Sequence, residues 1–211
     1  MVLEYPPGAD PRTARDSLES NPITHEEPAP FIHLYKTGFD GQALINAIES
    51  DNVDWHWSAT GGTTNNPKFS LTRDSRSMSL DGYIHDNRGF PFTAGQVAGF
   101  GMLLQIERAV WDYRLTYNLD LKDHQGWSIL KYGYGGQYLM HTDHGRNDPR
   151  RISVVAYLNT VKNSGATIFP YVDVAIQPVE GNIAVFPSGN AYSHLAEPAQ
   201  ETKYAAVSWF I

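Results

Sequence analysis

A histidine and an aspartate one residue apart, His141-Thr-Asp143, are the first candidates for chemistry in this chain. On a β-strand the side chains at positions i and i+2 point to the same face, so an imidazole and a carboxylate here would project side by side. Adjacent nitrogen and oxygen donors suit a first-row transition metal. The spacing is a weak signal by itself, because His25-Glu-Glu27 repeats it inside a proline-rich segment, where we do not expect a metal site.

A third metal ligand has to come from elsewhere in the chain, and His194 is the best candidate. It follows the apolar run at 184–186 and precedes the apolar C-terminal segment. Two histidines and one carboxylate on one face form a facial triad with open positions, which suits ferrous iron with a chelating cosubstrate and dioxygen. Lys203 lies shortly after His194, and its cation could pair with the distal carboxylate of a dicarboxylate chelator.

Composition excludes several other classes of site. The 211 residues include no cysteine, which rules out disulfides, cysteine-ligated zinc and iron–sulfur clusters, and thiol nucleophiles. With 16 basic and 23 acidic residues the formal net charge is −7, which argues against a nucleic-acid partner. We find neither a signal peptide nor an apolar run long enough to span a membrane, so we expect a cytoplasmic protein without membrane contact.

The elements that must position these residues are predicted from local patterns. Residues 1–30 are polar and proline-rich, which predicts an extended arm before a single domain over 31–211. We expect a strand at 31–35, a helix capped by Asp40 that ends near Ile48, and a weak strand at 70–80. Thr93 and Gln96 form a capping box, which predicts a helix that ends near Asp112. Residues 58–68 and 81–91 are predicted to be loops.

Short strands dominate the rest of the sequence. Apolar or alternating runs predict strands at 127–132, 137–143, 152–159, 166–169, 182–187 and 203–211. Helices followed by many short strands indicate an α+β protein with a β-sandwich or barrel in its C-terminal half.

An ordered set of motifs surrounds the candidate ligands. It comprises Tyr-Gly-x-Gly-Gly-Gln-Tyr-x-x-His-x-Asp (132–143, where x is Tyr134 at its first occurrence), Tyr-Leu-Asn (157–159), Gly-Ala-Thr-x-Phe-Pro (165–170), Pro-x-x-Gly-x-x-x-x-Phe (178–186), His194, Lys203 and Trp209. In these motifs the chain resembles the Fe(II)/2-oxoglutarate dioxygenases, within them the prolyl 4-hydroxylase branch, and Phe-Pro-Ser at 186–188 is similar to its bacterial and phage members. The resemblance implies a double-stranded β-helix (jelly roll) core over about 127–211 with N-terminal helices packed on it.

The resemblance also implies roles for individual residues. His141, Asp143 and His194 match the iron ligands, which would make them the catalytic centre. The residues expected near 2-oxoglutarate are Lys203 and Tyr157 at its C5 carboxylate, Tyr132 close to the cosubstrate, and Thr167 and Trp209 lining the pocket. The implied cofactors are Fe(II), 2-oxoglutarate and dioxygen, with ascorbate as an additional candidate.

The implied reaction is hydroxylation of a C–H bond with release of succinate and CO2, and a prolyl residue in a peptide or protein is the first expected substrate. A free amino acid or another small molecule is the alternative substrate, and a non-catalytic jelly-roll binding module is the alternative function. Nucleic-acid demethylation on the same fold is disfavoured by Trp209, which stands where that subfamily carries an arginine, and a hydrolytic zinc site would leave Lys203 and Tyr157 without a purpose.

Two departures from the family pattern lie beside the predicted site. Ser164-Gly165 replaces the usual Gly-Gly, and Leu139-Met140 replaces the common polar or proline residues before the first ligand. These departures affect the expected identity of the substrate more than the expected iron ligands. A basic cluster of Arg146, Arg150 and Arg151 is a candidate for substrate contact. The sequence predicts no oligomeric state.

Overall fold

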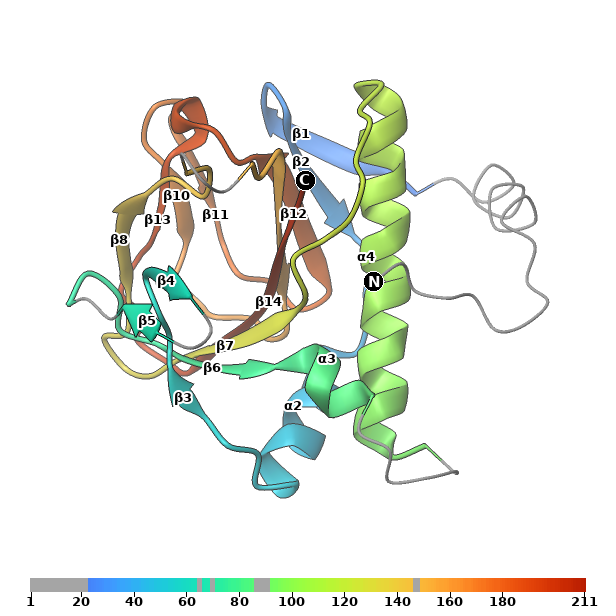
Figure 1. The fold of residues 1–211 in the computed structure, drawn as a ribbon, viewed down its shortest axis with the longest axis vertical. Helices are drawn as coiled ribbons and strands as arrows, with labels where there is room; N and C mark the ends of the chain where they lie inside the picture. Colours follow the sequence, from blue (N-terminus) through green and yellow to red (C-terminus); the bar gives the residue numbers. More distant parts are fainter. Residues whose placement is uncertain (1–22, 64–65, 69–70, 86–91, 146–148) are drawn as a thin grey trace.

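Two antiparallel β-sheets face each other, and helices cover the outer face of the larger one (Figure 1). The structure is a computed structural model, and it describes residues 23–63, 66–68, 71–85, 92–145 and 149–211. Two facing antiparallel sheets are the arrangement of a jelly roll, so the predicted α+β fold with a jelly-roll core and N-terminal helices is confirmed.

The larger sheet has eight strands in the order β1-β2-β12-β9-β14-β7-β6-β3. Their bounds are β1 His25–Ala29, β2 Ile32–Lys36, β12 Asn182–Pro187, β9 Ile152–Tyr157, β14 Lys203–Phe210, β7 Ser128–Tyr132, β6 Arg76–Ser79 and β3 His56–Trp57. The smaller sheet has four strands in the order β11 Val174–Ile176, β10 Thr167–Phe169, β13 His194–Ala196 and β8 Tyr138–His141. A separate hairpin pairs β4 Gly61–Thr63 with β5 Asn66–Lys68, and a short 3-10 helix spans Asn190–Tyr192.

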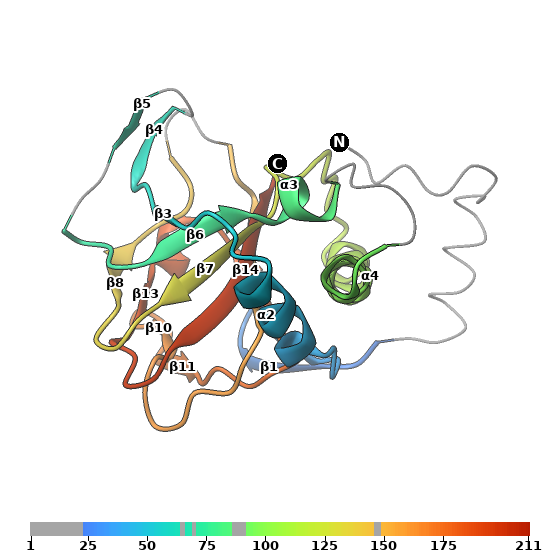
Figure 2. The same ribbon diagram turned by 90° about the horizontal axis from the view of Figure 1, so that it is seen from below.

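Three helices lie on the side of the larger sheet that faces away from β8 and β13 (Figure 2). They are α2 Gly41–Ser50, α3 Leu80–Ile84 and α4 Ala94–Thr116. Asp40 caps α2 by accepting a hydrogen bond from the backbone of Ala43, and Thr93 forms the predicted capping box with Gln96 at the start of α4. Among the residues that the structure describes, no helix combines the length and apolar character needed to cross a membrane.

The strands of the larger sheet bury both faces, which divides the apolar core in two. One face packs against the helices through residues such as Ile129, Val154 and Ile183, which meet Leu44 and Ile106. The opposite face packs against the smaller sheet, and this second cluster contains Ile32, Tyr157, Phe169, Ile176 and Phe186. Because a strand turns alternate side chains to opposite faces, the same strand can both hold the helices and line a site between the sheets.

Several elements differ from the sequence predictions. The end of the predicted arm forms β1, which pairs with β2 at the sheet edge, whereas residues 1–22 lie outside the described residues. The prediction of a loop at 81–91 was wrong over its first part, because these residues belong to the short helix α3, which Ser79 caps. Residues 86–91 lie outside the described residues. Helix α4 continues past Asp112 to Thr116 and ends before Asn118, whose positive φ of 48° takes the chain out of the helix.

The strand predictions missed the shortest strands. Within the predicted loop 58–68 the chain forms β4 and β5, and the predicted strand at 70–80 is limited to β6. Strands β3, β11 and β13 have two or three residues each, which is too short for an alternating pattern to be visible in the sequence.

Candidate metal centre and adjoining cavity

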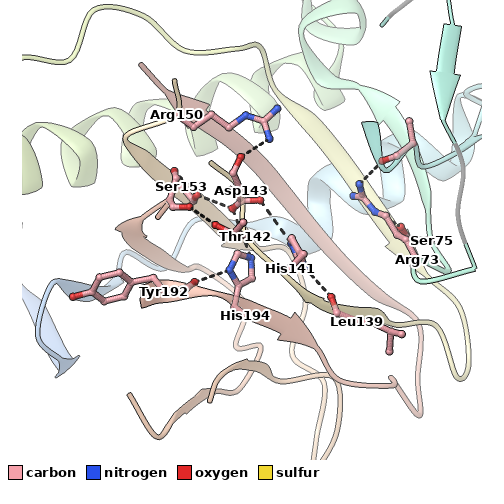
Figure 3. A network of polar contacts seen from close by, with 12 residues as sticks. Arg73, Ser75, Leu139, His141, Thr142, Asp143, Arg150, Ser153, Tyr192 and His194 are labelled. Atoms are coloured by element: carbon pink, nitrogen blue, oxygen red, sulfur yellow. Dashed lines mark hydrogen bonds and ion pairs between the residues drawn. The ribbon is translucent and has the colours of Figure 1, made fainter. Parts of the chain in front are cut away.

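His141, Asp143 and His194 converge at one point between the two sheets (Figure 3). The Nε2 atom of His141 lies 3.7 Å from Oδ1 of Asp143, and the Nε2 atom of His194 lies 3.7 Å from Oδ2 of the same carboxylate. One ligand atom from each residue falls within 4.8 Å of the other two. The three predicted ligands therefore meet closely enough to share one ion.

Strand register brings the two histidines together. His141 is the last residue of β8 and His194 is the first of β13, and the two are direct cross-strand partners in the antiparallel pair. Their rings lie 4.4 Å apart. Asp143 lies beyond the end of β8, so simple alternation along one strand does not by itself place its carboxylate beside His141.

Backbone carbonyls fix the orientation of both rings. The Nδ1 atom of His141 lies 2.9 Å from the carbonyl oxygen of Leu139, and Nδ1 of His194 lies 3.1 Å from that of Tyr192. A carbonyl can only accept, so each Nδ1 carries a proton, and in a neutral ring the Nε2 atom that faces Asp143 keeps its lone pair. This is the tautomer that a histidine ligand needs.

Burial and charge set the protonation states of the triad. Burial, reinforced by the nearby His194, lowers the pKa of His141 to about 4, so its imidazole is neutral at neutral pH. For Asp143, burial alone would raise the pKa, but His194, His141 and hydrogen bonds from Ser153 and Trp209 outweigh it, and the net pKa is lowered. Imidazole nitrogens and an ionised carboxylate are donors that fit Fe(II).

A cavity of about 330 Å³ adjoins the triad. Its lining includes alternate residues of β14, namely Lys203, Ala205, Val207 and Trp209, which share one face of that strand. Tyr132 and Thr167 also line it. The structure thus places four of the five residues predicted near 2-oxoglutarate on the same cavity as the triad.

Lys203 is the buried cation of this cavity. Only 2% of its surface is exposed, and its Nζ atom donates a 2.6 Å hydrogen bond to the carbonyl of Gly165. The ammonium lies 5.3 Å from the ring centre of Tyr132 and 5.6 Å from that of Tyr157. Burial lowers the pKa of Lys203 to about 7, which makes the site receptive to an anionic ligand that would stabilise the ammonium.

Tyr157 takes a different position from the other predicted cosubstrate residues. Its side chain is fully buried between the sheets and does not line the cavity. Its hydroxyl donates a 2.8 Å hydrogen bond to Oγ1 of Thr167, which does line the cavity. To donate to a bound ligand, the Tyr157 hydroxyl would have to turn its proton away from Thr167, whose own hydroxyl could then donate to Tyr157.

The sequence motifs did not single out several residues around the triad. Arg73 lies over the ring of Tyr138 at 4.7 Å, and Tyr138 stacks on His141 with ring centres 3.6 Å apart. Arg73 precedes β6, far from the motifs in sequence, so no local pattern could have predicted its place. The hydroxyl of Ser153 donates to Oδ2 of Asp143 at 2.7 Å.

The basic cluster is only partly described by the structure. Arg150 lines the cavity, its guanidinium lies 3.8 Å from the ring centre of Trp209, and it donates to the carbonyl of Asp143. Arg146 lies outside the described residues. Arg151 donates to the carbonyl of Asp120 and thus is engaged away from the triad.

A second group of potential metal ligands, His25, His33 and Asp112, lies where β1 and β2 meet α4. Both ring nitrogens of His33 are engaged, Nδ1 with the hydroxyl of Tyr35 at 3.0 Å and Nε2 with that of Tyr117 at 2.8 Å. Asp112 accepts from Tyr35 and lies 3.0 Å from Nδ1 of His25. These side chains therefore contact one another and their neighbours, and the group links the hairpin of β1 and β2 to α4.

Comparison with known proteins agrees with this site. Residues 127–211 match the model of the 2OG-Fe(II) oxygenase superfamily. An alignment of 86 residues with prolyl 4-hydroxylase subunit alpha-1 of Gallus gallus shows 34% identity and covers 34% of this chain. The matched segment spans 17% of that relative's length.

Solved structures share the fold. A prolyl hydroxylase of Trichoplax adhaerens, in complex with a peptide fragment of the hypoxia inducible factor oxygen degradation domain, has a TM-score of 0.64 at 17% identity over 95% of this chain and 89% of its own. A Pseudomonas putida prolyl-4-hydroxylase has a TM-score of 0.60 at 17% identity over 94% and 97%. The viral collagen prolyl hydroxylase of Paramecium Bursaria Chlorella virus-1 has a TM-score of 0.60 at 14% identity over 85% and 95%.

By this match, residues 127–211 resemble the 2OG-Fe(II) oxygenase superfamily. The resemblance predicted from the motifs is confirmed, and the fold that surrounds this domain is the one seen in prolyl hydroxylases.

Proposed function

We propose that this protein is an Fe(II)- and 2-oxoglutarate-dependent oxygenase that hydroxylates a prolyl residue in a peptide or protein. The observation that carries the proposal is the convergence of a two-histidine, one-aspartate triad and a buried lysine on one cavity. Each component answers a separate requirement, since the triad provides metal ligands and Lys203 provides a counter-charge for a carboxylate.

Each group of residues has a defined task in this proposal. His141, Asp143 and His194 would hold Fe(II), which together with 2-oxoglutarate and dioxygen supplies the oxidising chemistry when bound. Lys203 would pair with the distal carboxylate of 2-oxoglutarate, while Tyr132 and Thr167 shape the wall around it. Ala205 and Val207 add an apolar stretch to the cavity wall between Lys203 and Trp209.

A peptide substrate is supported by relatives and by the surface around the triad. The Gallus gallus relative is a prolyl 4-hydroxylase subunit, and the Trichoplax adhaerens enzyme was solved with a peptide fragment. Leu139 and Met140 lie next to His141 with 47% and 51% of their surfaces exposed. Arg150 adds a planar cation at the cavity lining, where it could donate hydrogen bonds to peptide carbonyls.

Ligand binding tests the first half of the proposal. Calorimetry under anaerobic conditions should show 2-oxoglutarate binding when Fe(II) or Mn(II) is present and much weaker binding without a metal. No heat of binding in the presence of metal would remove the assignment as a 2-oxoglutarate enzyme.

Product analysis tests the second half. Incubation with Fe(II), 2-oxoglutarate, air and a set of proline-containing peptides should yield peptides that have gained one oxygen atom, with one succinate formed per hydroxylation. Fragment mass spectra should place that oxygen on proline. Oxygen gained only by non-prolyl residues would keep the oxygenase and contradict the prolyl substrate.

Replacing a triad ligand tests its assignment directly. His141→Ala and Asp143→Ala should each abolish succinate formation, because two remaining ligands cannot hold the metal in the facial arrangement. His56→Ala is the matched control, since its imidazole is 70% exposed on β3 outside the cavity lining. Succinate release at the unaltered rate in either triad variant would exclude that residue from the ligand set.

A further inference from the structure

Asp143 occupies an unusual place among the triad residues, because no strand positions it. His141 and His194 are locked as cross-strand partners of β8 and β13, whereas β8 ends two residues before Asp143. Its carboxylate is nevertheless the ligand that contacts both imidazoles, at 3.7 Å each. Some other contact must hold it in place.

Two buried serines supply such a contact, in addition to the hydrogen bond from Trp209. Ser153 on β9 and Ser188, which directly follows β12, are each 1% exposed. The hydroxyl of Ser153 lies 2.7 Å from Oδ2 of Asp143 and 2.8 Å from the hydroxyl of Ser188 (Figure 3). The two strands are neighbours in the larger sheet, so the serines stand on a rigid support.

The number of available protons fixes which group donates in each hydrogen bond of this chain of hydroxyls. Each serine has one O–H proton, and the ionised carboxylate of Asp143 can only accept. Ser153 therefore donates to Asp143, and Ser188 has to donate to Ser153. The resulting order, Ser188 to Ser153 to Asp143, gives each hydroxyl one donated bond, and a charged acceptor makes the last bond the strongest.

The main chain of Ser188 holds the turn that carries Asp143. Its carbonyl accepts hydrogen bonds from Oγ1 of Thr142 at 3.0 Å and from the backbone N–H of His144 at 2.9 Å. The main chain of Ser188 thus hydrogen-bonds the residues on both sides of Asp143, while its side chain is linked to the carboxylate by way of the Ser153 hydroxyl. Together these contacts replace the strand pairing that Asp143 lacks.

We propose that Ser153 and Ser188 are positioning residues for the metal-ligating carboxylate of Asp143. The serine chain engages Oδ2 and sets the rotation of the carboxylate, which leaves Oδ1 free of the serine contact for the metal. This inference rests on the metal site of the proposed function. Contacts of this kind commonly change metal affinity by about 10- to 100-fold when they are removed.

The chain offers a matched control in Ser208. This serine lies on β14 next to β9, is fully buried, and its hydroxyl has no hydrogen-bond partner among the described residues. Ser208→Ala therefore removes a buried hydroxyl from the same sheet without touching Asp143. Any effect seen in Ser153→Ala but not in Ser208→Ala belongs to the carboxylate contact.

Titration of the metal-free protein with Mn(II), without cosubstrate, tests the proposal. We expect Ser153→Ala to weaken Mn(II) binding by about 10- to 100-fold, Ser188→Ala to weaken it less because the direct bond to Asp143 remains, and Ser208→Ala to leave it unchanged. The visible absorption of bound Co(II) should shift in Ser153→Ala and return toward the native spectrum in Ser153→Thr, which restores a hydroxyl.

The outcomes separate this inference from the proposed function. If the native protein binds no Mn(II), both fail together. Unaltered affinity and an unaltered Co(II) spectrum in Ser153→Ala would overturn the serine assignment while the metal site stands, and so would equal weakening in Ser208→Ala. Ser188 lies outside the strands, so Ser188→Ala provides the decisive comparison if Ser153→Ala lowers the yield of folded protein.

Discussion

At the scale of single residues, burial decides which groups around the cavity carry charge. His141 is neutral because burial and the neighbouring His194 oppose its protonation. Burial also lowers the pKa of Lys203, to about 7, although the negative charge of Glu197 partly opposes this shift. The cavity therefore carries a cation whose charge depends on pH close to neutrality.

The pKa of Lys203 predicts how 2-oxoglutarate binding depends on pH. Only the ammonium form pairs with a carboxylate, and in the free protein this form predominates below pH 7 and is lost above it. With Mn(II) present, the dissociation constant of 2-oxoglutarate should rise with pH, by up to about tenfold per pH unit above 7 until the pKa of the bound state is reached. Calorimetry at several pH values measures this.

Two controls isolate Lys203 in that experiment. Pyruvate has the same 2-oxo acid group without a distal carboxylate, so its binding should lack this pH dependence. Lys203→Met should bind 2-oxoglutarate weakly at every pH. A dissociation constant of 2-oxoglutarate that stays flat across this range would show that Lys203 does not pair with the ligand.

At the scale of elements, each secondary structure has one face for the site and another for the core. Strand β14 turns Lys203, Ala205, Val207 and Trp209 to the cavity, while Tyr204 and Ala206 pack toward the helices. The helices stabilise this sheet from its outer face through residues such as Leu44 and Ile106. Stability and metal binding thus depend on different faces of the same strand.

This separation predicts that a helix cap can be lost without loss of the site. Thr93 accepts a hydrogen bond from the backbone of Gln96, and the Gln96 side chain accepts one from the backbone of Thr93. Thr93→Ala should lower the free energy of unfolding by about 1 kcal/mol and leave Mn(II) affinity unchanged. Urea denaturation and metal titration of the same preparation measure the two effects.

Thr116 provides the control for this prediction at the other end of α4. Its hydroxyl donates to the carbonyl of Asp112 on an exposed surface, so Thr116→Ala should change stability by less than about 0.5 kcal/mol. A loss of Mn(II) affinity in Thr93→Ala would mean that the helix layer and the cavity are coupled more tightly than their separate faces indicate.

At the scale of the whole molecule, the candidate metal centre joins the two sheets. His141 and His194 belong to the smaller sheet, whereas Asp143 is held through Ser153 on β9 of the larger one. The unfolded chain cannot gather these ligands, so an ion at this site binds the folded state and stabilises it by mass action.

Metal binding should therefore raise the melting temperature. Mn(II) at 100 times its dissociation constant should add about 2.7 kcal/mol, which corresponds to roughly 5–10 °C for a protein of this size. A chelator should reverse the shift, and Asp143→Ala should show none. Thermal unfolding followed by circular dichroism measures it, and an equal shift in Asp143→Ala would place the stabilising ion elsewhere.

The sequence alone determined which residues are candidates for the proposed chemistry. Residue types that can ligate ferrous iron and pair with a carboxylate recur at characteristic spacings, and local signals such as the cap at Asp40 and the capping box at Thr93 were enough to predict where helices begin. The jelly-roll class was implied by the family resemblance that these motifs carry. The helix caps and the His141-Thr-Asp143 spacing depend on neighbours in the chain, which a sequence displays directly.

Only the tertiary structure decided how the ligands are held. The pairing of His141 with His194 depends on the register between β8 and β13, and β13 is too short to show a pattern. The serine chain to Asp143 joins positions that are 10 and 35 residues apart. Such contacts arise because sheet pairing brings distant segments together, and no local propensity encodes them.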